Sequence, residues 1–268
     1  MQTSVVIPAF NNQDLLDQCL DTLSQQTQSP DEIIVIDDGS DPPLTAPTKA
    51  LLRRIDRKST HRGSSAAKNM GARMARGRYL IFSDAEILHM REGIESLVAC
   101  AHAFERDGIP DILLNVMRIN LQIRVFPSET KDMDAFTRYS RQCEWIDGRN
   151  ENMAVPALCF EQNAALIPRE FFWRIGGYDE VGFPGWGFNN HDLCLRVAEA
   201  NGHVTSFIER GKSGRRLVCF HNYHDSPASQ EEATKEFKAK WGQPFEPAMV
   251  RERLQRSEDA RRQAQQHS

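Results

Sequence analysis

The sequence predicts an α/β protein with a mostly parallel central sheet and helices on both faces. Three apolar segments in the first third of the chain, at 4–7, 33–36 and 79–82, are short and unbroken. Segments with apolar residues at helical spacing separate them, and polar residues follow each one directly. Strands that are buried on both faces have such unbroken apolar sequences, and their alternation with helices is typical of parallel sheets.

The elements of the first third can be placed from this pattern. In order, we expect a strand at 4–7, a helix over 15–23, a strand at 33–36, a helix from a Ser64 or Ser65 cap to Gly77, and a strand at 79–82. A Pro-rich loop follows the second strand.

The rest of the chain is less regular. We expect a helix around 97–104, strands at 112–116 and 119–126, a long polar loop over 127–155, a strand at 164–167, a helix from Pro168 to Trp173, a helix over 190–201, and strands near 203–208 and 216–220. Ser229 can cap a last helix that contains Phe237 and Trp241. Residues 248–268 have few apolar anchors, so we expect a solvated helix or tail there.

Composition and hydropathy argue against a nucleic-acid-binding function and against a transmembrane segment. The chain has 268 residues, of which 40% are hydrophobic and 26% charged, and its formal net charge is −4. This acidic balance argues against a nucleic-acid-binding protein, which usually has a basic face. No apolar run approaches the roughly 20 residues that span a bilayer. We therefore expect no transmembrane segment, although peripheral association with a membrane stays open.

The cysteines and the N-terminal residues bear on the compartment. None of the six cysteines forms a CxxC pair, which disfavours a zinc knuckle or a dithiol redox site. Their mostly apolar surroundings indicate buried, reduced side chains, and the N-terminal residues show no signal-peptide pattern. We therefore expect a cytoplasmic protein.

Polar clusters follow the three early strands at the ends where ligands bind in parallel sheets. The clusters are Pro8-Ala9-Phe10-Asn11, Asp37-Asp38-Gly39-Ser40 and Asp84-Ala85-Glu86. The last cluster offers hard oxygen ligands that suit Mg²⁺ or Mn²⁺. Asp38 can accept hydrogen bonds from a base or ribose, and Phe10 can stack on a base. Each cluster taken alone is also compatible with an ordinary turn or with core packing.

The order and spacing of these clusters carry a resemblance. SVVIPAFNN, IIVIDDGSDP and RGSSAAKNMGARMARGRYLIFSDAEI together resemble the nucleotide-sugar-binding half of family 2 glycosyltransferases, over residues 3–88. The resemblance implies the GT-A, or nucleotide-diphospho-sugar transferase, fold. It implies that Phe10 stacks on uracil, that Asp38 contacts the base, and that Asp84-Ala85-Glu86 stands for the DxD motif that binds metal and diphosphate. The donor-binding residues implied are Pro8, Phe10, Asn11, Asp38, Lys68, Asn69 and Asp84.

The second half extends the resemblance to the acceptor region of galactosyl- and N-acetylgalactosaminyltransferase-like members. NAALIPREFFWRIGGYDE and GWGFNNHDLCLRV match this region, whose motif runs Trp-Gly-x-Glu-Asp-x-Asp-Leu. Aligned on this motif, Trp186, Gly187 and Asn189 are the implied acceptor-binding residues. The Glu-Asp pair falls on Asn189 and Asn190, at least one of which we expect to cap the following helix.

This departure leaves the general base open. In inverting members the second acid takes the acceptor's proton, which Asn190 can orient but not accept. The base can come from Asp192, our first choice, or from His191 or Asp179. A retaining mechanism or binding without efficient transfer would need no base at position 190.

A late histidine completes the implied metal site. His221 follows the strand near 216–220, where related metal-dependent members place a histidine in the metal shell. We expect Asp84, Glu86 and His221 to be the metal ligands, with His224 as the alternative histidine. A neutral imidazole beside carboxylates fits manganese better than calcium.

The sequence thus predicts one GT-A domain over 1–226, with a nucleotide-sugar half at 1–90 and an acceptor half at 91–226, and a helical extension or tail over 227–268. We expect Mn²⁺- or Mg²⁺-dependent transfer of a sugar from a nucleoside diphosphate sugar, with UDP as the expected nucleotide, to a glycan or other hydroxyl acceptor such as a lipid-linked saccharide. A catalytically weak sugar-nucleotide-binding or glycan-binding protein is the alternative. A nucleotidyltransferase is disfavoured because no Gly-rich triphosphate loop follows the first strand. The sugar, the acceptor, the stereochemistry, the oligomeric state and the role of 127–155 stay open.

Overall fold

The computed structural model comprises residues 1–268. It describes residues 1–47, 49–55, 63–120, 131–133, 164–183, 187–207, 218–221 and 231–244, and single residues or pairs at 249, 252–253, 255–256, 259 and 263. The side chains at 117–120, 205–207, 218, 220, 231 and 232 are outside this description.

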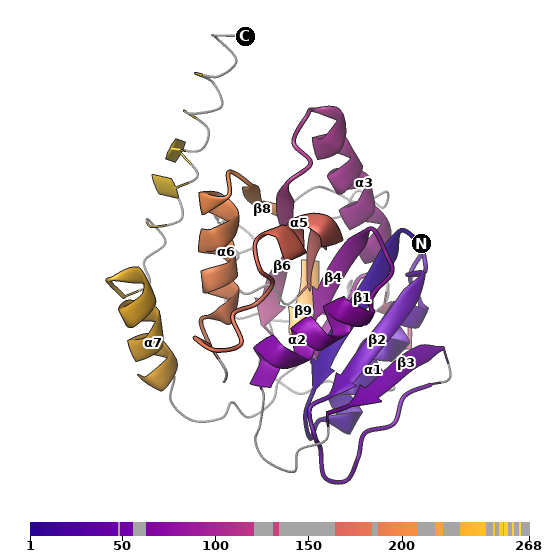
Figure 1. Ribbon diagram of the computed structural model, residues 1–268. Coiled ribbons are helices and arrows are strands. Elements are labelled where there is room, and N and C mark those ends of the chain that lie inside the picture. Colours follow the sequence, from indigo (N-terminus) through magenta and orange to yellow (C-terminus); the bar gives the residue numbers. More distant parts are fainter. Residues whose placement is uncertain are drawn as a thin grey trace.

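A single mixed sheet forms the centre of the described part of the chain (Figure 1). Its strands run in the order β3-β2-β1-β4-β7-β6-β9-β5, and β8 pairs with β6. The strands are β1 (Thr3–Ala9), β2 (Glu32–Asp37), β3 (Ala50–Arg54), β4 (Tyr79–Ser83), β5 (Ile87–His89), β6 (Ile112–Asn120), β7 (Ala164–Pro168), β8 (His203–Phe207) and β9 (Val218–His221). Most pairings are parallel, but β7 runs antiparallel between β4 and β6, and β5 runs antiparallel to β9.

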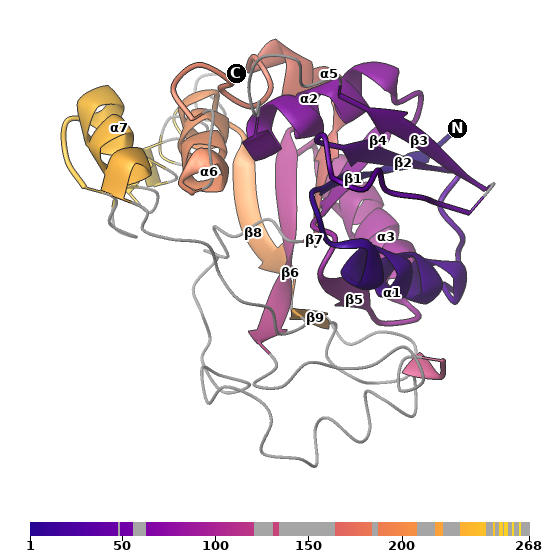
Figure 2. The same cartoon turned by 90° about the horizontal axis from the view of Figure 1, so that it is seen from below.

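Helices cover both faces of this sheet (Figure 2). They are α1 (Gln13–Ser24), α2 (Gly63–Met74), α3 (Gly93–Arg106), α5 (Arg169–Arg174), α6 (Asn189–Glu199) and α7 (Glu231–Trp241). One apolar cluster joins the sheet to α1 and α3, and a second joins the opposite face to α2, α5, α6 and α7. Adjacent strand residues alternate between the clusters, since Val5 belongs to the first and Val6 to the second. Continuous apolar strands are therefore explained by burial on both faces.

The parallel arrangement of β1, β2 and β4 determines where their polar clusters lie. Ala9 at the end of β1 is opposite Asp37 at the end of β2, and Val6 is opposite Phe82 of β4. Residues 8–11, 37–40 and 84–86 therefore leave the sheet at the same edge, as the sequence predicted.

Several elements differ from expectation. β3, in the segment interpreted as loop, pairs with β2 as an edge strand. β6 continues through Asn120, where two strands were expected, and the remainder of 119–126 lies outside the described residues. α2 begins at Gly63. Its Ser65 hydroxyl donates to the Phe183 carbonyl at 2.8 Å, so this side chain connects two segments.

The C-terminal helix α7 packs against the rest of the fold. It lies beside α6 in both cartoon views (Figures 1 and 2), and Phe237 is fully buried in the second apolar cluster. Met249, in the segment expected to be solvated, belongs to the same cluster with an exposed fraction of 2%. Apolar anchors thus continue beyond the position where the sequence indicated a tail.

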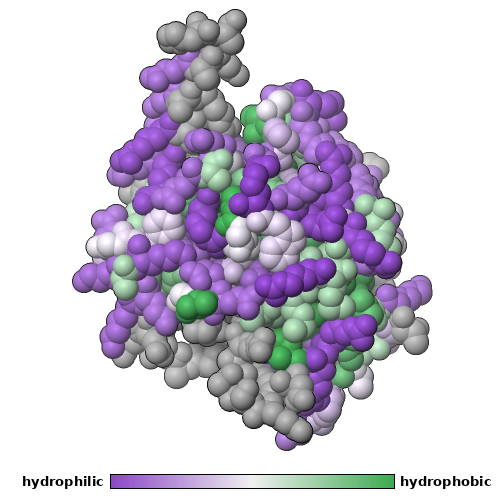
Figure 3. Space-filling model, viewed as in Figure 1, coloured by the Kyte–Doolittle hydropathy of each residue, from purple (hydrophilic) through white to green (hydrophobic). Residues whose placement is uncertain are grey.

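The surface is mixed in polarity. The face in Figure 3 is mostly hydrophilic, with scattered apolar patches, several of them where β2 and β3 lie in Figure 1. Across the described residues, no helix combines the length and the apolar character needed to cross a membrane.

Candidate active site

The loops after β1 and β2 are joined by side-chain hydrogen bonds. Asn11, in the left-handed region with φ 53°, donates its backbone N–H to Ser40 Oγ at 2.9 Å. The backbone N–H of Asp41 donates to Asn11 Oδ1 at 2.9 Å. These reciprocal bonds hold the two strand-end clusters in one rigid unit, with the ring of Phe10 on the surface at 42% exposure.

The two aspartates of the second cluster have different surroundings. Asp37 Oδ1 accepts the backbone N–H of Ser40 at 2.8 Å, and Oδ2 accepts that of Leu44 at 3.2 Å. Burial alone would raise the pKa of Asp37, but the hydrogen bonds from Ser40 and Leu44 and the nearby Arg54 bring it below its ordinary value. Asp37 therefore shapes the loop. Asp38 is 3% exposed, and its backbone N–H donates to the Ala9 carbonyl at 2.9 Å.

The third cluster forms a tight turn between β4 and β5. The backbone N–H of Ile87 donates to the Asp84 carbonyl at 3.2 Å. Ile87 pairs with His221 across the β5–β9 ladder, which brings the end of β9 next to the turn. As a result, Nε2 of His221 lies 3.5 Å from Oε1 of Glu86, and both side chains are partly exposed.

Lys68 of α2 connects this turn to the start of α6. Its Nζ lies 3.1 Å from Asp84 Oδ1 and donates to Asn190 Oδ1 at 3.4 Å. The Lys68 side chain is only 2% exposed, and its ammonium sits over the Tyr178 ring, 5.3 Å from the centroid. Burial raises the pKa of Asp84, and the neighbouring Lys68 opposes that rise. Asp84 and Asn190, which are far apart in sequence, thus contact the same buried ammonium group.

The start of α6 has an unusual backbone. Gly187 and Phe188 have φ values of 105° and 54°, and Phe188 occupies the cap position without a side-chain cap bond. The prediction that Asn189 or Asn190 caps this helix is therefore wrong. Asn189 Oδ1 accepts the backbone N–H of Asn190 at 2.9 Å and orders the first turn from inside.

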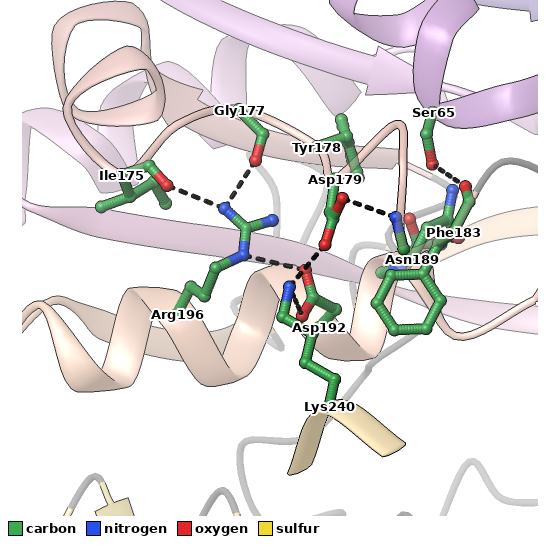
Figure 4. Close-up of polar contacts among 12 residues, drawn as sticks. Ser65, Ile175, Gly177, Tyr178, Asp179, Phe183, Asn189, Asp192, Arg196 and Lys240 are labelled. Atoms are coloured by element: carbon green, nitrogen blue, oxygen red, sulfur yellow. Dashed lines mark hydrogen bonds and ion pairs between the residues drawn. The ribbon is translucent and has the colours of Figure 1, made fainter. Parts of the chain in front are cut away.

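Asp192, the first choice of base from the sequence, lies in a buried ionic network (Figure 4). Its side chain has no exposed surface, and Arg196 Nε lies 2.8 Å from Oδ2. Its other oxygen, Oδ1, is 2.7 Å from Lys240 Nζ and accepts Trp241 Nε1–H at 3.0 Å. This carboxylate holds α6 and α7 together, and its geometry argues against contact with an acceptor hydroxyl.

The same network extends to the segment before α6. Arg196 Nη1 donates to the carbonyls of Ile175 and Gly177 at 2.8 and 2.6 Å (Figure 4). Asp179 Oδ1 accepts the backbone N–H of Gly182 at 2.8 Å, and its Oδ2 pairs with Lys240 at 2.7 Å. Asp179, like Asp192, is therefore engaged in structural contacts.

Two further sequence-derived site residues have buried surroundings. Asn69 is 2% exposed, and its amide donates to the Tyr178 carbonyl while its oxygen accepts the Tyr178 N–H, at 2.8 and 2.9 Å. Asn69 thus fixes the Tyr178 segment. Burial lowers the pKa of His191 to about 4, so this imidazole is neutral at pH 7.

The structure therefore brings together Asp84, Glu86, His221, Lys68 and Asn190. Trp186 and His224 lie outside the described residues, as does all of the polar 127–155 loop except 131–133. Sequence reasoning missed Tyr178 under the Lys68 ammonium and Lys240 between Asp179 and Asp192. Neither residue could be identified from the sequence, because both contacts join segments that are far apart along the chain.

The donor set around the turn is chemically suited to a divalent cation. Two carboxylates and an imidazole are ligands that Mn²⁺ accepts, and Mg²⁺ prefers the oxygens. Glu86 and His221 face each other, and the charges of both act on Asp84. Within the described ranges no three such side chains form a closed ligand group. The residues thus fit an ion that takes part of its coordination from a bound phosphate.

Comparisons with known proteins find two family models that match successive parts of the chain. The family model described as glycosyl transferase family 2 matches residues 4–147, and that described as the N-terminal domain of galactosyltransferase matches residues 164–222. A validoxylamine A glucosyltransferase of Streptomyces hygroscopicus subsp. limoneus is 28% identical over 226 residues, covering 72% of this chain and 47% of the relative. The uncharacterized glycosyltransferase YfnE of Bacillus subtilis is 31% identical, covering 84% of this chain and 66% of that protein.

Solved structures show the same fold. S. aureus TarS matches with a TM-score of 0.58 at 13% identity, over 95% of this chain and 42% of the TarS chain. A structure of GalNAc-T7 with UDP, GalNAc and Mn²⁺ matches with a TM-score of 0.55 at 17% identity, over 89% of this chain and 48% of that one. The chain spans about half the length of the first curated relatives it matches. With its first family model covering more than half of its residues, the chain belongs to glycosyl transferase family 2 and has the GT-A fold.

Proposed function

We propose that the protein transfers a glycosyl unit from a nucleoside diphosphate sugar, in particular a UDP-sugar, to a hydroxyl group of a glycan or lipid-linked saccharide. The observation that carries this proposal is the meeting of the Asp84-Ala85-Glu86 turn, His221 and the start of α6 around Lys68. Family membership, relatives named as glucosyltransferases and a structural neighbour with UDP and Mn²⁺ support it.

The donor nucleotide is assigned to the unit formed by the loops after β1 and β2. Phe10 offers an exposed ring for the uracil, and Asp38, which is only 3% exposed, is assigned to the polar edge of the base. Because Asn11, Ser40 and Asp37 hold both loops by hydrogen bonds, the donor meets a preformed surface. Pro8 is the partly buried residue of β1 that precedes Ala9, the last residue of the strand.

The diphosphate is assigned to the turn after β4. Asp84, Glu86 and His221 would hold Mn²⁺ or Mg²⁺, which supplies positive charge to the leaving diphosphate when bound. Lys68 adds a second, fixed positive charge in a site with little access to water, where such charges act strongly. The chain's own contribution is thus to place cationic groups where charge develops.

The acceptor is assigned to the start of α6, with Gly187, Asn189 and Asn190, and with Trp186 as its platform. Asn190 can orient a hydroxyl through its carboxamide but cannot take its proton. Among the base candidates from the sequence, Asp192 and Asp179 are paired with Lys240. The lowered pKa of His191, about 4, makes it a weak base.

The pairing of Asp192 and Asp179 with Lys240 and the low basicity of His191 favour a second candidate function. A protein that binds the sugar nucleotide and transfers sugar slowly would keep the donor unit and the metal turn without an efficient base. Both the transferase and the binding protein should bind the nucleotide, but only the transferase should turn over the donor efficiently.

A donor screen separates the two candidates. UDP release from a panel of UDP-sugars is measured with Mn²⁺, with and without glycan and lipid-linked acceptors. We expect acceptor-stimulated release from at least one donor, and loss of the metal-dependent part in Glu86→Ala. Glu170→Ala, at an exposed position on α5, is the matched control and should retain activity. UDP binding without release from any donor would replace the transferase by the binding protein.

A further inference from the structure

Ser83 and His89 are hydrogen-bonded to each other across the base of the Asp84–Glu86 turn. Ser83 is the last residue of β4 and His89 the last residue of β5, and Ser83 Oγ lies 2.8 Å from His89 Nε2. Their exposed fractions are 0% and 3%. The bond therefore closes, inside the core, the loop that carries the two acidic residues.

This pair also holds the backbone of the turn against α1. The Ser83 hydroxyl donates to the Asp84 carbonyl at 3.2 Å, and Cys19 Sγ lies 3.8 Å from both Ser83 Oγ and the Asp84 carbonyl oxygen. The backbone N–H of His89 donates to Thr22 Oγ1 at 3.1 Å. Since α1 is packed through its buried face, the turn is fixed to a rigid neighbour.

The position of His221 depends on the same strand. In the antiparallel β5–β9 pair, Ile87 lies opposite His221 and His89 lies opposite Cys219. Glu86 directly precedes Ile87, which explains why it faces His221 at 3.5 Å. A displacement of β5 relative to β4 would therefore move Glu86 and His221 together, away from Asp84.

We propose that the Ser83–His89 hydrogen bond positions the metal-binding turn: it fixes Asp84, at the end of β4, relative to Glu86 and His221, which β5 and β9 carry. The inference rests on the proposed function, because the cation belongs to that function. Side chains that orient metal ligands from behind typically change metal affinity by about 10- to 100-fold when they are replaced. Ser83 and His89 are positioning residues in this sense, because they act on the backbone of the turn and not on the side-chain atoms that would bind the cation.

The competing explanation is that the bond only satisfies two buried polar groups. A variant that replaces both Ser83 and His89 distinguishes the two explanations. Replacing both partners of a buried hydrogen bond by apolar groups can be nearly neutral for stability, whereas removing one leaves the other unsatisfied. Ser83→Ala/His89→Leu should therefore fold while lacking the bond between β4 and β5.

Mn²⁺ is the probe, titrated into the protein with saturating UDP and followed by the electron paramagnetic resonance signal of the free ion. The variants are Ser83→Ala, Ser83→Ala/His89→Leu and His89→Gln, whose amide reaches toward Ser83 as the imidazole does. Tyr79→Phe is the matched control, because it removes a hydrogen bond at the other end of β4, the 2.7 Å bond to Glu105. Thermal melting of each variant reports folding separately.

We expect the double variant to melt near the wild type and to bind Mn²⁺ about tenfold more weakly or worse. His89→Gln should recover most of the affinity, and Tyr79→Phe should match the wild type. Unchanged Mn²⁺ affinity in the folded double variant would overturn the positioning role and leave the proposed function intact. Failure of the wild type itself to bind Mn²⁺ with UDP would overturn the metal-dependent function and, with it, this inference.

Discussion

At the scale of single residues, Lys68 is the most informative position in the site. Its buried ammonium contacts both Asp84, in the turn after β4, and Asn190, in the first turn of α6. A buried charge is tolerated only with partners, so each contact depends on the other. The lysine thus connects the turn after β4 to the start of α6.

Replacing Lys68 tests this dependence. Lys68→Met keeps the chain length but leaves the Asp84 carboxylate without its cation, which we expect to cost about 3 kcal/mol of unfolding free energy at pH 7. Urea unfolding measures the loss, with exposed Lys235→Met on α7 as the matched control. The loss should shrink at lower pH, because Asp84 can then be neutralised by a proton. Equal stability of both variants would contradict the assigned role.

A second prediction at this scale concerns pH. Burial lowers the pKa of His89 to about 4, from an ordinary value of 6.5 in the unfolded chain. Between these values the unfolded chain binds more protons at His89 than the folded chain does. The stability that the neutral His89 contributes is therefore complete above pH 6.5 and is lost as the pH falls toward 4. From pH 7 to pH 5 we expect His89 alone to reduce the unfolding free energy by about 2 kcal/mol.

Urea unfolding at both pH values checks the histidine effect. His89→Gln cannot titrate, so its unfolding free energy should fall less over this range than that of the wild type. His191, with a similarly lowered pKa, leaves part of the pH dependence in the variant. A pH dependence unchanged by the substitution would mean that His89 is not held neutral.

At the scale of elements, α7 is joined closely to α6 and to the residue before it. The helix lies beyond both family-model matches, the later of which ends at residue 222. Phe237 nevertheless packs against Phe188 at the start of α6, with ring centroids 5.2 Å apart. Lys240 and Trp241 reach the buried Asp192 from the same helix. We infer that α7 supports the first turn of α6, which presents Asn189 and Asn190.

Lys240 offers the test of that support. Lys240→Met removes the cation shared by Asp179 and Asp192, and we expect a loss of about 2 kcal/mol in unfolding free energy. Lys238→Met, exposed on the same helix, should be nearly neutral. Amide hydrogen exchange should show faster exchange in the first turn of α6 for Lys240→Met alone. Equal exchange in both variants would show that α7 does not support the first turn of α6.

At the scale of the whole molecule, the sequence predicted the half of the site that local patterns encode. Unbroken apolar strands followed by polar residues suffice to place Phe10, Asp38 and Asp84 at one edge, because parallel strands end at the same edge. The fold and family followed from the same clusters and are confirmed. The roles of the individual donor and metal residues stay predictions.

The other half depends on contacts that no local pattern encodes. Lys68 and Asn190 are 122 positions apart, and Asp192 is buried only because α7 supplies Lys240 and Trp241. Asp192 was a candidate base because it lies two positions after Asn190, where the resemblance implies an acid, and the sequence gives no sign of its burial. The three-residue strand β5 was too short to show a period, yet it aligns Glu86 with His221.

We propose that the strand-end loops and the Asp84–Glu86 turn with His221 form one metal-dependent nucleotide site. Calorimetric titration of UDP, with and without Mn²⁺, is the sharpest test of this site. We expect one UDP per chain, bound about tenfold more tightly or better with Mn²⁺, which corresponds to about 1.4 kcal/mol. The gain should vanish in Glu86→Ala and persist in Glu170→Ala. UDP affinity that is independent of Mn²⁺ in the wild type, or no UDP binding, would contradict the claim.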